Sequence, residues 1–135
     1  MTDKNTSHLA GEFLVAGELA RRGYPVSITM GNAKAIDIHA DVKGQKDTIR
    51  IQVKATRSKT SWPIRNDDIE DDLYYVFVYL QTENKIKENT PPEYFIVHGK
   101  ELNSRNLVRP WKNMPGITYR SLEDYRERWD GLPPP

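Results

Sequence analysis

The sequence predicts a single domain of the α+β class. A helical pattern comes first, segments that alternate apolar and polar residues follow, and further helical patterns lie near the end. Strands joined by turns favour α+β over a doubly wound sheet, in which helices alternate with strands. The 135 residues, 37% of them hydrophobic and 29% charged, suffice for one hydrophobic core. We expect one domain over residues 1–131 and a loose, proline-rich tail at 132–135.

The composition excludes several kinds of protein and site. The chain has no cysteine, which excludes a disulfide scaffold, thiolate metal ligands and a cysteine nucleophile. Its formal net charge is +1, so overall charge does not indicate nucleic-acid binding. No apolar run reaches the length of a membrane span, and the first residues lack the basic start and apolar core of a signal peptide. We therefore expect a cytoplasmic protein without a membrane partner.

The first helix is expected to begin at Thr6 or Ser7, which are good N-capping residues, and to end at Gly23. Helical spacing gathers four apolar residues on the side that should face the core. These residues are Leu9, Phe13, Ala16 and Ala20.

Two glutamates on this helix are predicted to differ. Glu12 lies at the margin of the apolar side and should point towards whatever the helix packs against. Glu18 lies on the opposite side, near Arg21 and Arg22, where we expect it to meet solvent.

Three strands are expected next, at 24–30, 35–42 and 48–56, with a hairpin turn around Gly44 between the last two. In the second strand Ile36, Ile38 and Ala40 alternate with Asp37, His39 and Asp41. Such a turn places Asp37 opposite Gln52 or Val53, with Lys54 one step further along the same polar face.

The rest of the chain is predicted to add two strands and two helices. The strands are 73–81, expected in the centre of the sheet, and 93–99. The helices are 100–107 and 121–129, the second with Ser121 as its N-cap. A loop or a short helical turn is expected at 57–65 and at 66–72, a polar loop at 82–92 and an irregular segment at 109–116.

The polar face of the third strand raises the question of function. Residues 49–56 read IRIQVKAT, with Gln52 and Lys54 in mid-strand, where lysine is usually depleted. An acid and a lysine on neighbouring strands often form only a cross-strand charge pair, and this remains the plain alternative to a site. His8 and His98 give no site signal of their own.

Glu12, Asp37, Gln52 and Lys54 follow one another on a helix and two adjoining strands. This order resembles the PD-(D/E)xK nuclease superfamily, which includes type II restriction enzymes, Holliday-junction resolvases and a group of homing endonucleases. The resemblance covers residues 7–98 and implies a restriction-endonuclease-like fold, a mixed central β-sheet flanked by helices. Two positions depart from the motif: Ile36 replaces its proline and Gln52 replaces its second acid.

The resemblance implies a magnesium or manganese site. Phosphodiester hydrolysis uses a divalent cation to stabilise phosphate charge and activate water, and Mg²⁺ prefers oxygen ligands. The implied ligands are Asp37, Gln52, the carbonyl of Val53, and Glu12, directly or through water. Lys54 would orient the attacking water and help to neutralise the phosphate. The implied catalytic residues are therefore Asp37, Gln52, Lys54 and Glu12.

The stretch that begins at Lys54 is basic and contains one tryptophan. Arg57, Lys59 and Arg65 surround Trp62, and such a stretch can follow a phosphate backbone and stack on a base. We expect these five residues to bind nucleic acid. The alternative is a solvated loop with Trp62 packed on the body of the protein.

The leading functional prediction is a Mg²⁺-dependent endonuclease that hydrolyses nucleic acid, with DNA favoured by the resemblance and a homodimer as a reasonable oligomeric state. The first alternative is a catalytically degenerate module of the same fold that binds nucleic acid or a protein, because Gln52 is a weaker metal ligand than a carboxylate. The second alternative is a regulatory protein that acts through the acidic segment 66–72.

Overall fold

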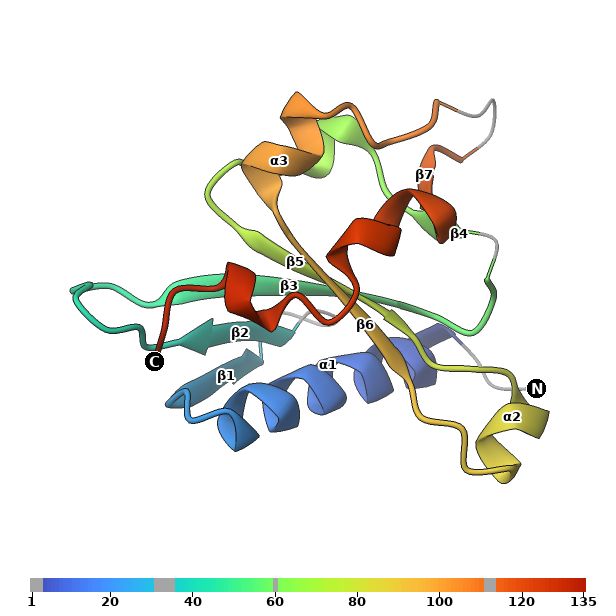
Figure 1. Ribbon diagram of the computed structural model, residues 1–135, viewed down its shortest axis with the longest axis horizontal. Helices are drawn as coiled ribbons and strands as arrows, with labels where there is room; N and C mark the ends of the chain where they lie inside the picture. The colour runs from blue at the N-terminus through green and yellow to red at the C-terminus, as the bar shows by residue number, and fades with distance from the viewer. Residues whose placement is uncertain (1–3, 31–35, 60, 111–113) are drawn as a thin grey trace.

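The computed structural model describes residues 4–30, 36–59, 61–110 and 114–135, and only the backbone of Met30, Ile36 and Asp37. It confirms the α+β class and contains a mixed five-stranded sheet with helices on its faces (Figure 1). The helices are α1 (Lys4–Arg21), α2 (Glu83–Lys87) and α3 (Gly99–Ser104), and the 3₁₀ turns are η1 (Asn66–Asp68), η2 (Arg120–Tyr125) and η3 (Trp129–Gly131). The strands are β1 (Val26–Met30), β2 (Ile36–Ala40), β3 (Ile49–Thr56), β4 (Ser61–Pro63), β5 (Tyr74–Tyr79), β6 (Glu93–His98) and β7 (Gly116–Thr118).

The main sheet has the order β1-β2-β3-β5-β6. Strand β2 pairs antiparallel with both β1 and β3. Strands β3 and β5 are parallel, and β5 and β6 are antiparallel. The parallel pair requires a long crossover, which carries β4 and η1 between β3 and β5. β5 lies inside the sheet, as predicted for residues 73–81, and β4 forms a separate two-stranded sheet with β7.

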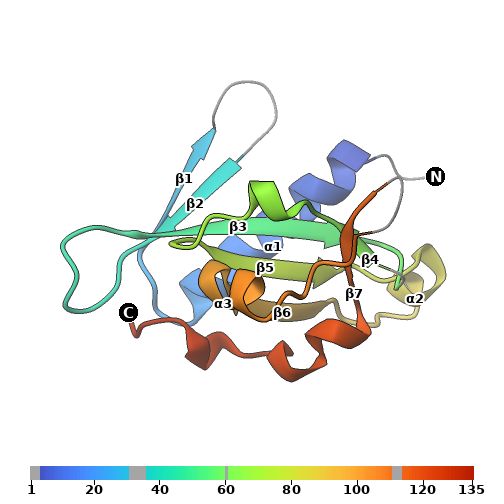
Figure 2. The same ribbon diagram turned by 90° about the horizontal axis from the view of Figure 1, so that it is seen from above.

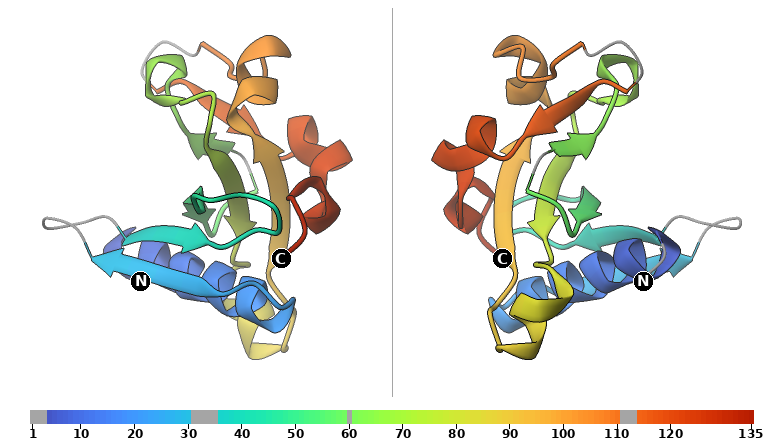
Figure 3. Two further views of the ribbon diagram at one scale, coloured as in Figure 1. Left: turned by 90° about the vertical axis from the view of Figure 1, so that its left-hand side faces the viewer. Right: turned by 90° about the vertical axis from the view of Figure 1, so that its right-hand side faces the viewer.

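Two hydrophobic cores lie on the two faces of the sheet. Helix α1 covers one face, where Val15 and Leu19 pack with apolar residues of β2 and β3. The other face carries Phe77 and Phe95 under α3, η2 and the β4–β7 sheet, with Trp62 between them. Figures 1 and 3 show α1 on one side of the sheet and α3 on the other. None of the described helices has the length and apolar character needed to cross a membrane.

The buried side of α1 is not the side that the sequence predicted. Leu9 and Phe13 are exposed, whereas the buried residues are Ser7, Gly11, Val15, Ala16 and Leu19. The physical reason is the small size of Gly11, which lets the helix backbone approach β3. A helix with apolar residues on two sides can dock by either, and the closer approach buries the side that includes Val15 and Leu19.

Several smaller predictions also need correction. Residues 83–87 form the short helix α2, with the Thr82 hydroxyl accepting from the amide of Lys85, where a polar loop was expected. The expected helix at 121–129 is instead two 3₁₀ turns, separated by Glu127 at a φ of 54°. Ser121 is not an N-cap; its amide donates to the hydroxyl of Thr118 at 3.1 Å.

The C-terminal residues lie against the body of the protein, where a loose tail was expected. Leu132 is buried in the α1 core, and the hydroxyl of Tyr24 donates to the Pro133 carbonyl at 2.6 Å. The amide of Lys43 donates to the Pro134 carbonyl at 2.9 Å. The chain therefore returns to the start of β1 and the turn after β2.

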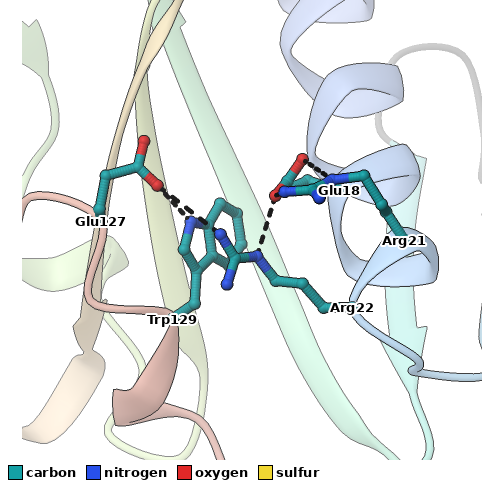
Figure 4. Close-up of polar contacts among 5 residues, drawn as sticks. All are labelled: Glu18, Arg21, Arg22, Glu127 and Trp129. Carbon is teal, nitrogen blue, oxygen red and sulfur yellow. Dashed lines mark hydrogen bonds and ion pairs between the residues drawn. The ribbon is translucent and has the colours of Figure 1, made fainter.

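A polar cluster joins this terminal segment to the end of α1 (Figure 4). The Arg22 guanidinium lies 4.9 Å from the centre of the Trp129 ring and donates a hydrogen bond to the Glu18 carboxylate at 2.9 Å. The Trp129 indole donates to the Glu127 carboxylate at 2.6 Å. Glu18 also accepts from Arg21, which confirms the predicted proximity of Glu18 to both arginines, but its side chain is half-buried, at 18% exposed, where solvent exposure was expected. The cluster fixes the C-terminal end of α1.

Candidate functional site

The candidate site is built around the middle of β3. Strand alternation directs Val53 and Ala55 towards the α1 core, so Gln52 and Lys54 point to the opposite face. Lys54 is level with Phe77 in the parallel pairing with β5. Both polar side chains are half-buried. Gln52 and Lys54 are therefore placed on a structured strand inside the sheet, not on a solvated loop.

The strands β2 and β3 separate next to Gln52. Their pairing runs from Ala40 opposite Ile49 to Ile38 opposite Ile51. Continuing that register by one residue would set Asp37 level with Gln52, so the expected position of Asp37 opposite Gln52 or Val53 stays a prediction. Figure 2 shows β1 and β2 turning away from β3 towards the start of β2. Among the described pairings, β3 beyond Ile51 therefore has no β2 partner.

Helix α1 is held against the same stretch of β3. A Cβ atom on Gly11 would lie 2.5 Å from the Cβ of Ala55, so the helix backbone touches the strand at this point. One turn earlier, the Arg57 guanidinium donates to the Ser7 hydroxyl at 3.0 Å. These two contacts fix the N-terminal half of α1 beside the C-terminal half of β3.

The same helix brings His8 into the electrostatic field of Lys54. Partial burial of the ring lowers the pKa of His8 below its ordinary value of 6.5, and the positive charges of Lys54 and Lys4 lower it further. His8 and Glu12 are four residues apart and so lie on one flank of α1. Glu12 is half-buried, and neither Glu12 nor Gln52 is without an interaction partner.

The structure places Asp37 by its backbone alone. Asp37 lies in β2, opposite Thr29 of β1, and its side chain is outside the described residues. Among the side chains that are described, no three histidine or carboxylate groups gather to hold a metal ion. The remaining expected donors are the Glu12 carboxylate, the Gln52 amide and the Val53 carbonyl. All offer oxygen, which suits Mg²⁺ or Mn²⁺.

The basic residues after Lys54 do not all have the expected role. Arg57 is half-buried against Ser7, whereas Lys59 and Arg65 are exposed. The Lys59 ammonium lies 5.1 Å from the centre of the Tyr119 ring. Trp62 is only 1% exposed, and its indole donates to the Val78 carbonyl at 3.0 Å. A ring so enclosed has no free face for a base, so the expected stacking role of Trp62 is wrong.

Comparisons with protein-family models, with curated proteins and with solved structures find no match. The assignment of a function therefore depends on the residues and their arrangement.

Two features of the site were missed from the sequence. His8 stands four residues before Glu12, and this helical spacing was the available signal. The contact of Gly11 with Ala55 had no such signal, because a glycine in a helix does not reveal which strand it faces.

Proposed function

We propose that the protein is a metal-dependent nuclease of the PD-(D/E)xK type, with a restriction-endonuclease-like fold, and that it hydrolyses phosphodiester bonds in nucleic acid, most readily in DNA. One observation carries the proposal: α1 is fixed against β3 at Ala55 and Arg57, and the pairing of β2 with β3 ends at Ile51, one residue before Gln52. Asp37 lies on β2, Gln52 and Lys54 lie on β3, and Glu12 lies on α1, and these three elements contact one another.

The proposed mechanism divides the work among these residues. When bound, Mg²⁺ or Mn²⁺ would stabilise charge on the phosphate and activate a water molecule. Asp37, Gln52, Glu12 and the carbonyl of Val53 would hold the cation through oxygen atoms. Lys54 would orient the attacking water and neutralise the phosphate.

The substrate backbone is proposed to follow the cations that continue from β3. Lys59 is exposed just beyond the end of β3, and Arg65 is exposed beyond β4. Arg57 lies between Lys54 and Lys59 and would serve mainly to hold Ser7 of α1. Contacts of this kind recognise the charge of the phosphate backbone and not the base sequence. We therefore expect nucleic-acid binding to weaken steeply as the salt concentration rises.

A catalytically degenerate module of the same fold is the second candidate, and Gln52 is the observation that favours it. A neutral amide binds Mg²⁺ more weakly than a carboxylate does. Calorimetric titration with Mn²⁺ separates the two candidates. A nuclease should bind Mn²⁺ at a site that Asp37→Asn removes, whereas a degenerate module should show no binding that depends on Asp37.

The proposal is tested by cleavage of supercoiled, linear, single-stranded and branched DNA in Mg²⁺, in Mn²⁺ and in chelator. We expect metal-dependent cutting that Asp37→Asn abolishes and Asp41→Asn retains. Asp41 is a suitable control because it is an exposed acid just beyond the end of β2. Cutting that survives Asp37→Asn would indicate a contaminating nuclease or another site, and a folded protein that cuts no substrate would contradict the proposal.

A further inference from the structure

Basic side chains gather where the first turns of α1 meet the second half of β3. Lys4 and His8 are four residues apart and lie on the same flank of the helix. The positive charges of Lys54 and Lys4 both act on the His8 ring, so both lysines lie near it. Arg57 follows directly after the end of β3. We call these residues the cationic cluster: Lys4, His8, Lys54 and Arg57.

Arg57 joins the strand side of the cluster to the helix side. Its Nε donates to the Ser7 hydroxyl at 3.0 Å, and Ser7 directly precedes His8. Ser7 is only 9% exposed, so this hydrogen bond holds the guanidinium at the boundary between α1 and β3. The bond engages the Nε alone, which leaves the N–H groups of the two terminal nitrogens to bind a ligand.

The cluster differs from most arginines of the described residues in its lack of acidic partners. Five arginines form ion pairs with carboxylates, namely Arg21, Arg22, Arg105, Arg126 and Arg128. No such pair joins Lys4, Lys54 or Arg57 to a carboxylate whose side chain the structure describes. Like charges held together repel one another, and a negatively charged ligand would relieve that repulsion.

The cluster is open to solvent. Lys4 and His8 are exposed, and Arg57 is half-buried. Every side chain of β3 from Gln52 onwards is also half-buried, whichever face of the strand it occupies. A ligand can therefore reach these charges without a movement of the two hydrophobic cores.

We propose that the cationic cluster binds a phosphate group of the nucleic-acid backbone, next to the phosphate that is cut. The inference rests on the proposed nuclease site, because Lys54 belongs to both. The two non-bridging oxygens of a phosphodiester can accept from a guanidinium and an ammonium at once, and a neutral His8 still donates one ring N–H. The backbone then crosses the start of α1 as it leaves Lys54.

The affinity for a short DNA duplex in chelator, measured by fluorescence anisotropy at several salt concentrations, tests the proposal without cleavage. Lys4→Gln should weaken binding several-fold and reduce the slope of log K against log salt by about 0.9, the value for one phosphate contact. Lys100→Gln is the matched control and should bind like the wild type, because Lys100 is exposed on α3, across the sheet from α1 (Figure 1). A Lys4→Gln protein with wild-type affinity and salt slope would overturn the proposal.

An added charge at position 8 gives a second test. His8→Lys should bind the duplex more tightly than the wild type, because the new ammonium lies where a phosphate is proposed. Gly17→Lys adds the same charge to an exposed position of α1 at which a Cβ atom would meet no other atom, and it should bind like the wild type. Equal affinities of the two variants would overturn the proposal, because charge would then act without regard to its place.

Inorganic phosphate identifies the chemical group that the cluster binds. In chelator and at constant ionic strength, phosphate should shift the NMR signals of the His8 ring, and Lys54→Met should reduce that shift. His8 signals that phosphate leaves unmoved would overturn the site. A shift in a protein that binds no DNA would assign the site to a small phosphorylated molecule and overturn the nucleic-acid ligand.

The cluster and the proposed hydrolysis can fail separately. DNA binding that depends on Lys4, in a protein that cuts no DNA with any metal, would support the cluster and contradict only the hydrolysis. Metal-dependent cutting that Asp37→Asn abolishes, with DNA affinity unchanged in Lys4→Gln, would support the hydrolysis and overturn the cluster.

Discussion

A Cβ atom on Gly11 of α1 would lie 2.5 Å from the Cβ atom of Ala55 on β3. Real Cβ atoms essentially never come so close, so any other residue at 11 would force the helix or the strand to shift. The contact explains why α1 docks through Ser7, Gly11, Val15 and Leu19.

We expect Gly11→Ala to destabilise the protein by about 1–3 kcal/mol, the usual cost of inserting a methyl group into a packed contact. The free energy of unfolding in urea measures the effect. Ala55→Gly should restore part of the loss when combined with Gly11→Ala, because it removes the atom that the new methyl meets. Equal stability of Gly11→Ala and the wild type would show that α1 does not lie this close to β3.

Gly17→Ala is the control for this change, since position 17 lies on the same helix but faces open space. At low protein concentration it should raise the free energy of unfolding by up to ~1 kcal/mol, because alanine favours helix more than glycine does. A lower free energy of unfolding for Gly11→Ala and a higher one for Gly17→Ala would separate the packing effect from helix propensity.

His8 is expected to titrate below its ordinary pKa of 6.5, owing to partial burial and to the charges of Lys54 and Lys4. NMR of the His8 ring measures this pKa directly. Lys54→Met should raise the pKa of His8, whereas Lys43→Met, at the turn after β2, should leave it unchanged. An unchanged pKa in Lys54→Met would mean that α1 does not bring His8 close to Lys54.

The same shift makes stability depend on pH. Because the unfolded chain binds a proton at His8 more readily than the folded chain does, the free energy of unfolding should fall as pH drops below about 6.5 towards the folded-state pKa. His8→Gln should remove this component. If the free energy of unfolding of His8→Gln fell equally across that pH range, the pH dependence would come from other groups.

Glu93 at the start of β6 is the centre of a polar network. Burial opposes its ionisation, but hydrogen bonds from Tyr119 and Arg126, with a third from Gln81, outweigh burial and lower the pKa of Glu93 below 4.5. This stabilisation is present above pH 4.5 and is lost as pH falls through the folded-state pKa. Glu93→Gln should cost about 1.5–3 kcal/mol at pH 7, the range for hydrogen bonds to a charged group.

Glu88→Gln provides the comparison for Glu93→Gln. The Glu88 carboxylate is exposed and lies 3.6 Å from the ammonium of Lys85, and such surface pairs contribute at most about 1 kcal/mol. Urea unfolding at pH 7 and pH 4 should show a large, pH-dependent loss for Glu93→Gln alone. Similar losses in both variants would contradict the network.

Trp62 is expected to act in the core and not in binding. Its ring lies 5.7 Å from the rings of both Phe77 and Phe95, centre to centre. Trp62→Ala should therefore lower the free energy of unfolding by about 3–5 kcal/mol. Trp62→Phe should fold and bind oligonucleotides as tightly as the wild type. Loss of oligonucleotide binding by a stable Trp62→Phe protein would restore the stacking role.

The strands could be predicted because their patterns are local. Alternation in IRIQVKAT predicts the bounds of β3, and the glycine turn at Gly44, with its φ of 79°, joins two strands whose register sets Ile38 opposite Ile51. The side of α1 that packs could not be predicted in this way. Both of its sides are apolar, and only the tertiary contact of Gly11 with Ala55 decides between them.

The chemical part of the site is predicted less completely. The placement of Gln52 and Lys54 on one strand face follows from alternation, but the role of Asp37 as a metal ligand stays a prediction, since its side chain is outside the described residues. Trp62 was misplaced because a short basic segment does not reveal that it pairs with β7 and covers a core.

The rate at which Lys54→Met nicks supercoiled DNA, measured beside Lys43→Met under single-turnover conditions in Mn²⁺, tests the central claim most directly. Both changes remove one lysine charge, but only Lys54 lies on the polar face of β3. We expect wild-type and Lys43→Met proteins to cut at similar rates, and Lys54→Met to be slower by roughly 10²–10³-fold, the usual effect of losing one charge-stabilising donor. Equal rates for the two variants, or no cutting by the folded wild-type protein, would contradict a nuclease site at this strand.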